Sequence, residues 1–168
     1  MSGLPASVEP TAFGDYHQRS GIVLSNTAEI GKVEALGSIT VGAREVIDID
    51  DQIVNYRVTV DLKPSGEYAS EVSTEIPYDD VDAYVAALTQ LRKLNPAATK
   101  FAKFGASYSP KHGPHIMIFT AANGALVASV AHGGASAFLR NVADLERLEY
   151  CLVNAKKYID ANRTLPPG

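Results

Sequence analysis

Apolar and polar residues alternate strictly along residues 54–62. The apolar positions are Val54, Tyr56, Val58, Val60 and Leu62, and the polar positions between them are Asn55, Arg57, Thr59 and Asp61. A period of two over this length is typical of an antiparallel strand with one face on a core and the other in water. The sequence KPSGE at 63–67 then supplies the Pro and Gly of a hairpin turn. A return strand is therefore predicted over 68–76, where Val72 and Ile76 continue the pattern.

Shorter β-rich segments lie on both sides of this pair. They are predicted at 21–25, 32–41, 44–49, 101–108, 115–121 and 125–132. Short runs rich in β-branched residues and bounded by turn residues are typical of strands. Between the last two, Asn123-Gly124 is a strong hairpin signal, because both residues tolerate the positive φ of a type I′ turn.

Two segments have the period of an amphipathic helix. In the first, 78–94, one apolar stripe is formed by Val81, Tyr84, Val85, Leu88, Leu91 and Leu94. Aspartates in its first turn and basic residues in its last turn suit the helix macrodipole, and Asn95-Pro96 ends it. The second helix is predicted over about 141–162, with a stripe of Leu145, Leu148, Leu152, Ala155 and Ile159. At 1.5 Å per residue it is about 30 Å long, enough to cross a whole sheet.

The predicted fold class is α+β: an antiparallel β-sheet of seven to eight short strands with two helices, in the order βββββ-α-βββ-α. We expect a single α+β domain over 21–163. Residues 1–20 hold Pro5, Pro10 and two glycines without periodicity, which indicates an extended N-terminal arm. Residues 164–168 are predicted to form a similar tail.

The order of elements resembles that of known modules. From residue 53 onwards, the order ββαβββα is similar to that of longin- and roadblock-like modules. The fuller order, four or five strands and a helix followed by three strands and a helix, resembles that of the Whirly-type single-strand binders. This resemblance concerns topology, and no family motif accompanies it. Fold order by itself does not carry function.

Composition excludes several classes of protein. The 168 residues are 46% hydrophobic and 20% charged, which is ordinary for a globular domain. One cysteine rules out an internal disulfide framework and a Cys-rich zinc module. The longest apolar runs are about five residues, too short to span a membrane. No signal peptide is visible, so we expect a cytoplasmic protein, although an exported one whose signal peptide had been removed would look the same.

Charge is distributed unevenly along the chain. Residues 1–99 carry 7 Lys/Arg and 15 Asp/Glu, a net of −8, whereas residues 100–168 carry 8 and 4, a net of +4. A nucleic-acid site would need basic and aromatic residues together on one sheet face. The candidates for it are Lys100, Lys103, Lys111 and Arg140 with Phe101, Phe104 or Tyr108. Because the basic residues do not cluster and no aromatics interleave them, we expect neither nucleic acid nor a membrane as a partner.

Histidines offer the most specific hypothesis for chemistry. If Asn123-Gly124 forms a two-residue turn, His115 lies opposite His132, with Cβ atoms about 4.5–5.5 Å apart. His112 could then approach from the loop. A catalytic zinc ion takes three protein ligands, which three histidines can supply, and its fourth coordination position stays open. If the loop is instead a type I turn with Gly124 as a G1 bulge, His115 lies opposite Ala131. No carboxylate near these strands is placed to orient the imidazoles.

Other motifs have simpler structural explanations. The acidic runs 48–51 and 78–82 lack the EF-hand spacing that Ca²⁺ sites use. Neither GASAF at 134–138 nor GASYS at 105–109 completes the GxSxG nucleophile elbow. HGGAS, which begins at His132, lacks the spacing of a P-loop and is interpreted as a strand-to-helix link. Cys151 lies beside the stripe of the second helix and is expected to be a small core residue.

We therefore expect a small binding domain that acts through self-association or a protein partner, as a homodimer formed along an edge strand or the long helix. The first alternative is a small metal- or histidine-dependent hydrolase using His115 and His132. The second is single-stranded nucleic-acid binding through the basic C-terminal half. No catalytic motif is evident, so no catalytic residue, cofactor or metal is assigned.

Overall fold

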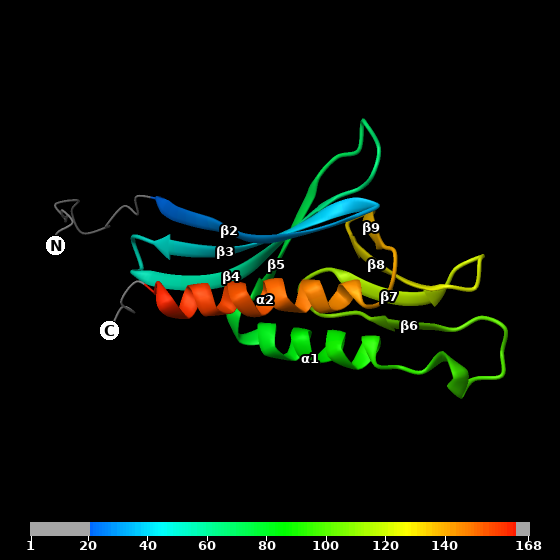
Figure 1. Cartoon of the computed structure of the whole chain (residues 1–168). Coiled ribbons are helices and arrows are strands. Elements are labelled where there is room, and N and C mark those ends of the chain that lie inside the picture. The colour runs from blue at the N-terminus through cyan, green and yellow to red at the C-terminus, as the bar shows by residue number, and fades with distance from the viewer. Residues whose placement is uncertain (1–20, 164–168) are drawn as a thin grey trace, which may run out of the picture.

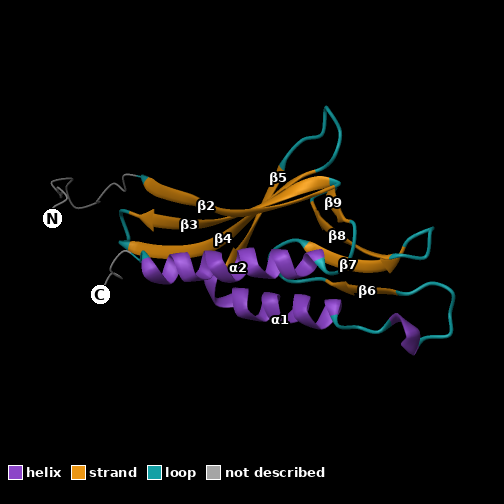
Figure 2. Cartoon of the chain, viewed as in Figure 1, coloured by secondary structure: helices purple, strands orange, loops and turns teal. Residues whose placement is uncertain are grey.

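The computed structural model describes residues 21–163, which form two antiparallel sheets and two helices (Figures 1 and 2). The first sheet has the strand order β2-β3-β4-β5, and the second has the order β6-β7-β8-β9. The strands of the first sheet are β2 (Val23–Ala35), β3 (Gly37–Asp48), β4 (Ile53–Lys63) and β5 (Val72–Pro77). Those of the second sheet are β6 (Gly105–Tyr108), β7 (His115–Thr120), β8 (Leu126–His132) and β9 (Ala135–Leu139).

The helices follow each sheet in the chain. A short 3-10 turn, η1 (Tyr78–Asp80), leads into α1 (Val81–Arg92), and a second one, η2 (Pro96–Ala98), follows it. The last element is α2 (Asp144–Ala161). This gives the order ββββ-α-ββββ-α, so the predicted α+β class with two helices and antiparallel strands is confirmed.

The distribution of strands differs from the prediction in two places. The three short segments expected before residue 50 are the two long strands β2 and β3, joined by a tight turn at Gly37, where φ is +96°. Four strands, not five, therefore precede α1. The segment 132–136, interpreted as a link to the final helix, instead forms a turn and the strand β9. The predicted N-terminal arm at 1–20 and the tail at 164–168 lie outside the described residues.

Helix α2 packs across β2, β3 and β4, and α1 packs beside α2 and reaches β6 and β7. The predicted stripe of α2 is buried at all five positions. In α1, Val81, Tyr84, Leu88 and Leu91 are buried, but Leu94 lies beyond the helix end and is 44% exposed. The strand pattern of β4 is also confirmed, since Val58, Val60 and Leu62 are buried.

The two sheets share one core. Its largest fully buried side chains include Ile39, Leu62, Ile76, Tyr84, Ile116, Ile118, Leu139 and Leu152, contributed by both sheets and both helices. The sheets also meet at their backbones, where Leu36 and Phe138 exchange two hydrogen bonds of 3.0 Å. Among the described helices, none has the length and apolar character needed to cross a bilayer.

Candidate functional site

The hairpin that carries the histidines has the bulged register. His115 lies opposite Ala131, and the pairs continue to Thr120 opposite Leu126. Gly124 has a φ of +86°, while Asn123 is not among the described residues with positive φ. A type I′ turn needs positive φ at both central residues, so the loop is a type I turn with a glycine bulge. The predicted pairing of His115 with His132 is therefore wrong.

The next hairpin, between β8 and β9, has the type I′ turn. Gly133 and Gly134 have φ values of +57° and +84°, and His132 lies opposite Ala135. Both turn residues therefore have the positive φ of a two-residue turn. This turn, rather than a link into α2, is what the paired glycines form.

The predicted histidine cluster is not assembled. His112 and His115 are exposed, and the nearest polar contact of His115 is between its Nδ1 and Ser109 Oγ, at 3.2 Å. Within residues 21–163, no group of three or more His, Cys, Asp or Glu is arranged to hold a metal ion. His132 is one residue beyond Ala131, the partner of His115, so the side chains of His115 and His132 point to opposite faces of the sheet. The hydrolase hypothesis gains no geometric support.

The loop before His115 is held by the core instead. Gly113 and Pro114 are buried, and the hydroxyl of Tyr84 donates to the carbonyl of Pro114 at 2.5 Å. Burial raises the pKa of Tyr84, so this phenol stays a donor. Tyr108 packs edge-to-face on the same ring, with centroids 5.3 Å apart. The loop with the sequence KHGPH is thus fixed to the core through Gly113 and Pro114.

The aromatic candidates for nucleic-acid binding do not form one exposed set. Phe104 and Tyr108 pack against the core, whereas Phe101 is 83% exposed in the loop before β6. Two of the three aromatic candidates are therefore turned away from solvent. Single-strand binding needs exposed rings on which bases can stack.

The remaining sequence candidates have structural roles. Asp48 accepts a hydrogen bond from the backbone N–H of Asp51 in the β3–β4 turn, at 3.1 Å. The central serine of each near-elbow motif lies in a regular strand, Ser107 in β6 and Ser136 in β9. Cys151 is half-buried on α2, and burial raises the pKa of its thiol. A Cβ added to Gly31 would lie 2.7 Å from the Cys151 sulfur, so this glycine allows α2 to approach β2 closely.

In the part of the chain that the structure describes, the first sheet has one long edge without a partner strand, which we call the β2 edge (residues Val23–Glu29 on the side of β2 away from β3). Among the described strands, none pairs with this side. The N–H of Ile49 donates to the carbonyl of Ile22, and Val23 lies opposite Asp48. Because hydrogen-bonded and non-bonded pairs alternate in antiparallel ladders, the odd-numbered residues direct their N–H and C=O groups outward. These residues are Val23, Ser25, Thr27 and Glu29.

The β2 edge lacks the features that protect other edges. Its sequence, VLSNTAE, contains no Pro, Lys or Arg, and the β-bulge of β2 comes only at its end, between Glu29 and Gly31. The opposite edge strand, β5, has six residues and ends at Pro77. In the second sheet, β6 has four residues, and β9 is bridged by Leu36. The β2 edge is thus the long unprotected edge of the described structure.

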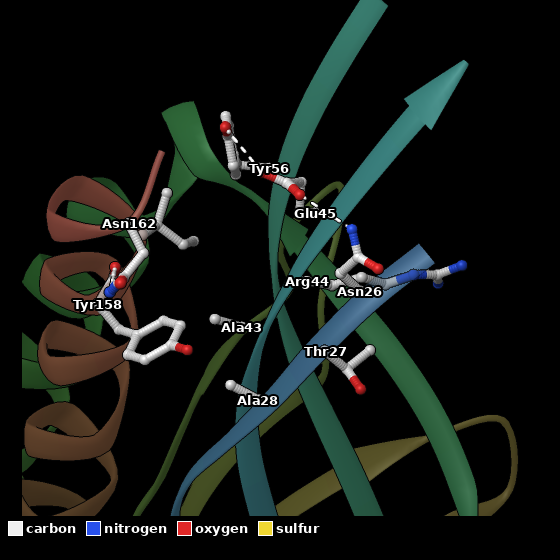
Figure 3. A pocket seen from close by; sticks show the side chains of 10 residues that line it. Asn26, Thr27, Ala28, Ala43, Arg44, Glu45, Tyr56, Tyr158 and Asn162 are labelled. Atoms are coloured by element: carbon white, nitrogen blue, oxygen red, sulfur yellow. Dashed lines mark hydrogen bonds between the residues drawn. The ribbon is translucent and has the colours of Figure 1, made fainter. Parts of the chain in front are cut away.

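Helix α2 lies beside this edge. Cys151 contacts Gly31 of β2, and Tyr158 lies near Ala28 (Figure 3). Residues three, four and seven apart share a helix face, so Arg147 and Asn154 lie on the same side. A strand added to the β2 edge would therefore place alternate side chains against this face of α2.

A pocket of about 120 Å³ opens where α2 ends above the first sheet (Figure 3). Its walls come from β2, β3, β4 and α2. They include Asn26, Ala28, Ala43, Glu45, Tyr56, Tyr158 and Asn162. The sequence patterns did not predict this pocket, although one signal was present. In β3 the inward positions Ile39, Val41 and Ala43 are apolar, and Glu45 is the next position in the same phase.

The opposite face of the first sheet forms a shallow polar groove of about 360 Å³. Glu75 bridges two arginines there: its Oε1 lies 2.8 Å from Arg57 Nη1, and its Oε2 accepts a short hydrogen bond from Arg44. Arg44 also donates through Nε to Ser25 Oγ, at 2.8 Å. The network ties together β2, β3, β4 and β5.

Glu75 should contribute to acid sensitivity. Burial acts to raise the pKa of its carboxyl, but hydrogen bonds from Arg57 and Arg44 and the charge of both guanidiniums together hold that pKa below its ordinary value of 4.5. A carboxyl with a lowered folded-state pKa stabilises the protein above its unfolded-state pKa, and this contribution is lost as the pH falls through the folded-state pKa. In urea titrations from neutral pH to pH values below 4.5, Glu75→Gln should therefore lose less free energy of unfolding than the unmodified protein. Glu67→Gln, in the exposed β4–β5 loop, is the control. An acid loss that is unchanged in Glu75→Gln would contradict the assignment.

Comparison with protein-family models, with curated proteins and with solved structures finds no match to this chain. The topological resemblance to other modules therefore gives no evidence about function. A functional proposal has to rest on the geometry of the described residues.

Proposed function

We propose that this domain is a protein-interaction module that associates with a second copy of itself through antiparallel pairing of the two β2 edges. The observation that carries the proposal is the outward row of backbone N–H and C=O groups along seven residues without a protective Pro or Lys. Such an edge is a ready template for another strand.

A second copy suits this edge for geometric reasons. Two identical edges pair antiparallel about a two-fold axis, so every contact occurs twice. The axis runs perpendicular to the sheet, so both α2 helices lie on the same face of the joined sheet. The row of Arg147, Cys151, Asn154 and Tyr158 would then face its symmetry mate. Apolar side chains at the start of β2, Val23 at 55% and Leu24 at 43% exposure, would lose water on pairing.

Thr27→Pro is the variant that tests the pairing. It removes an outward N–H without removing a hydrogen bond to β3, and edge strands tolerate Pro at such positions. Because the two-fold axis repeats the change, two hydrogen bonds are lost, and we expect dimerisation to weaken by about 10- to 100-fold. Thr27→Ala, which keeps the N–H, should dimerise as the unmodified protein does. Sedimentation equilibrium over a range of concentrations measures both.

Two results would overturn the proposal. One is a monomeric mass for the unmodified protein at every concentration. The other is a dimer that Thr27→Pro leaves as tight as before, which would place the contact elsewhere on the surface.

A further inference from the structure

The loop between α1 and β6, which we call the α1–β6 loop (residues 93–104), exposes an aromatic ring at one end of the molecule. Phe101 is 83% exposed, and Leu94, at the start of the loop, is 44% exposed. Figure 1 shows that this loop extends beyond α1, at the end of the molecule opposite to the start of β2 and the end of α2.

Local hydrogen bonds hold the ring in this position. Asn95 caps the short turn η2 with its side chain, and the N–H of Phe101 donates to Thr99 Oγ1 at 3.1 Å. At the end of the loop, the carbonyl of Phe104 accepts from the N–H of Thr120 at 2.9 Å, and its ring packs against the core. Phe104 therefore anchors the loop, whereas Phe101 protrudes from it.

The charge around the protruding ring is positive. No Asp or Glu occurs in the sequence between Asp82 and Asp144. Within the α1–β6 loop, Lys93, Lys100 and Lys103 are all exposed. None of these three lysines forms an ion pair with a described residue. The loop thus presents uncompensated positive charge beside an apolar side chain.

The acidic residues that reach the neighbouring end of α1 come from α2. They are Glu146 and Glu149, and both pair with Arg92. Their charge is therefore taken up by a residue outside the loop. What remains at the loop is an apolar ring between lysines, which is complementary to a surface that is both apolar and anionic.

The shape of the α1–β6 loop favours a membrane over other anionic partners. Neither the pocket nor the polar groove of the first sheet includes a residue of this loop, so an acidic peptide finds no groove in these hollows beside the lysines. A single-stranded nucleic acid stacks successive bases on several exposed rings, and Phe101 is the one ring of the loop that is mostly exposed. A bilayer interface accepts single apolar side chains with basic residues around them.

We infer that the α1–β6 loop binds the surface of anionic phospholipid membranes, with the Phe101 ring entering the interface and Lys100 and Lys103 contacting the head groups. A membrane partner was not expected from the sequence, because its apolar runs are short and its basic residues are dispersed. Binding at a surface needs only a few exposed side chains, and the structure places them on one protruding loop.

Tryptophan fluorescence tests the insertion directly, because the chain contains no tryptophan. Phe101→Trp introduces a single reporter into the loop. Its emission should shift to shorter wavelength with vesicles of equal parts phosphatidylcholine and phosphatidylserine, and brominated phosphatidylcholine in these vesicles should quench it. Tyr68→Trp is the matched control, since Tyr68 is 92% exposed but lies between Glu67 and Glu71. Its emission should not change.

Vesicle co-sedimentation measures the contributions of ring and charge. Phe101→Ser should weaken binding to the anionic vesicles by about tenfold, because the apolar ring no longer leaves water. The double variant Lys100→Gln/Lys103→Gln should weaken it by about 20-fold, since each lysine near an anionic surface contributes about fivefold. Tyr68→Ser and Lys157→Gln change exposed residues elsewhere and should bind as the unmodified protein does.

Three results would overturn the inference. They are no binding of the unmodified protein to the anionic vesicles, equal binding to vesicles of phosphatidylcholine alone, and binding that Phe101→Ser leaves unchanged. A response of Phe101→Trp to oligo-dT or polyglutamate but not to vesicles would assign the loop to another anion and overturn it as well. The variants leave the β2 edge unchanged, so the outcome is independent of the proposed self-association.

Discussion

Replacing Arg92 by methionine is expected to lower the free energy of unfolding by about 2–3 kcal/mol, because it leaves the carboxylate of Glu149 buried without its cation. The Glu149 side chain on α2 is 9% exposed, and Arg92 Nε on α1 lies 2.5 Å from its Oε2. Thr89 also donates to Oε1, at 2.6 Å, and would remain as a partner. The loss stays below that of a fully buried pair because Arg92 itself is 23% exposed.

Urea unfolding and thermal melts measure this loss, which corresponds to a fall in melting temperature of about 2–4 °C per kcal/mol at this chain length. Lys156→Met is a matched control, since it breaks an ion pair between the same two helices that does not involve Arg92. Its partner Asp82 is 78% exposed, so the loss should be much smaller. The double variant Arg92→Met/Glu149→Met should recover most of the stability. If Arg92→Met and Lys156→Met lower the free energy of unfolding equally, the Arg92–Glu149 ion pair is not effectively buried.

Gly113→Ala is expected to destabilise the protein by about 2–5 kcal/mol, through backbone strain and overpacking together. The residue has a φ of +105°, which L side chains rarely adopt. An added Cβ would also lie 2.8 Å from Ile76 Cγ1 and 3.1 Å from Tyr84 Cε2, within the shared core. The change would moreover disturb the bond from Tyr84 to Pro114 that holds the loop.

Gly124→Ala separates the two causes. Gly124 has a φ of +86°, but no atom lies within 4 Å of its added Cβ. This variant should therefore show the backbone strain alone, about 1–2 kcal/mol. Urea denaturation of both variants gives the difference. Equal losses at the two positions would show that the core around Ile76 accommodates the methyl group.

Much of the fold could be predicted because its signals are local. The stripe of α2 and the alternation along β4 each repeat over several turns or residue pairs, and both are buried as predicted. Pro77 and Asn95-Pro96 marked the ends of β5 and α1 closely. The predicted ends of elements were less accurate where tertiary contacts determine them. Leu94 continues the apolar period of α1 but lies past the end of the helix.

The two hairpin turns of the second sheet show where local chemistry is insufficient. Asn123-Gly124 and Gly133-Gly134 both permit a type I′ turn, but only the second adopts it among the described residues. The first forms a bulge, which moves His115 opposite Ala131. A shift of one residue moves every side chain of a strand to the other face, so the histidine hypothesis depended on one turn type.

The interaction surface stays a prediction. An edge strand or the long helix was the expected surface, but no sequence feature distinguished β2 as the edge, since strand order depends on pairings between distant segments. The pocket was not predicted because its walls are distant in the sequence. The wall residues at the end of α2 lie more than a hundred residues after those on β2, β3 and β4. Glu45, in phase with buried apolar positions, was the one available signal.

By itself, then, the sequence determined the α+β class, the two helices with their buried faces, and the phase of the strand pattern in β4. Each of these depends on residues within about ten positions of one another, where periodicity and backbone preference act directly. Only the tertiary structure decided the division into two sheets, the hairpin registers, the position of β2 at an edge of the described sheet, and the pocket between β2, β3, β4 and α2. These depend on which distant segments pack together, and that is settled by burial of the whole core.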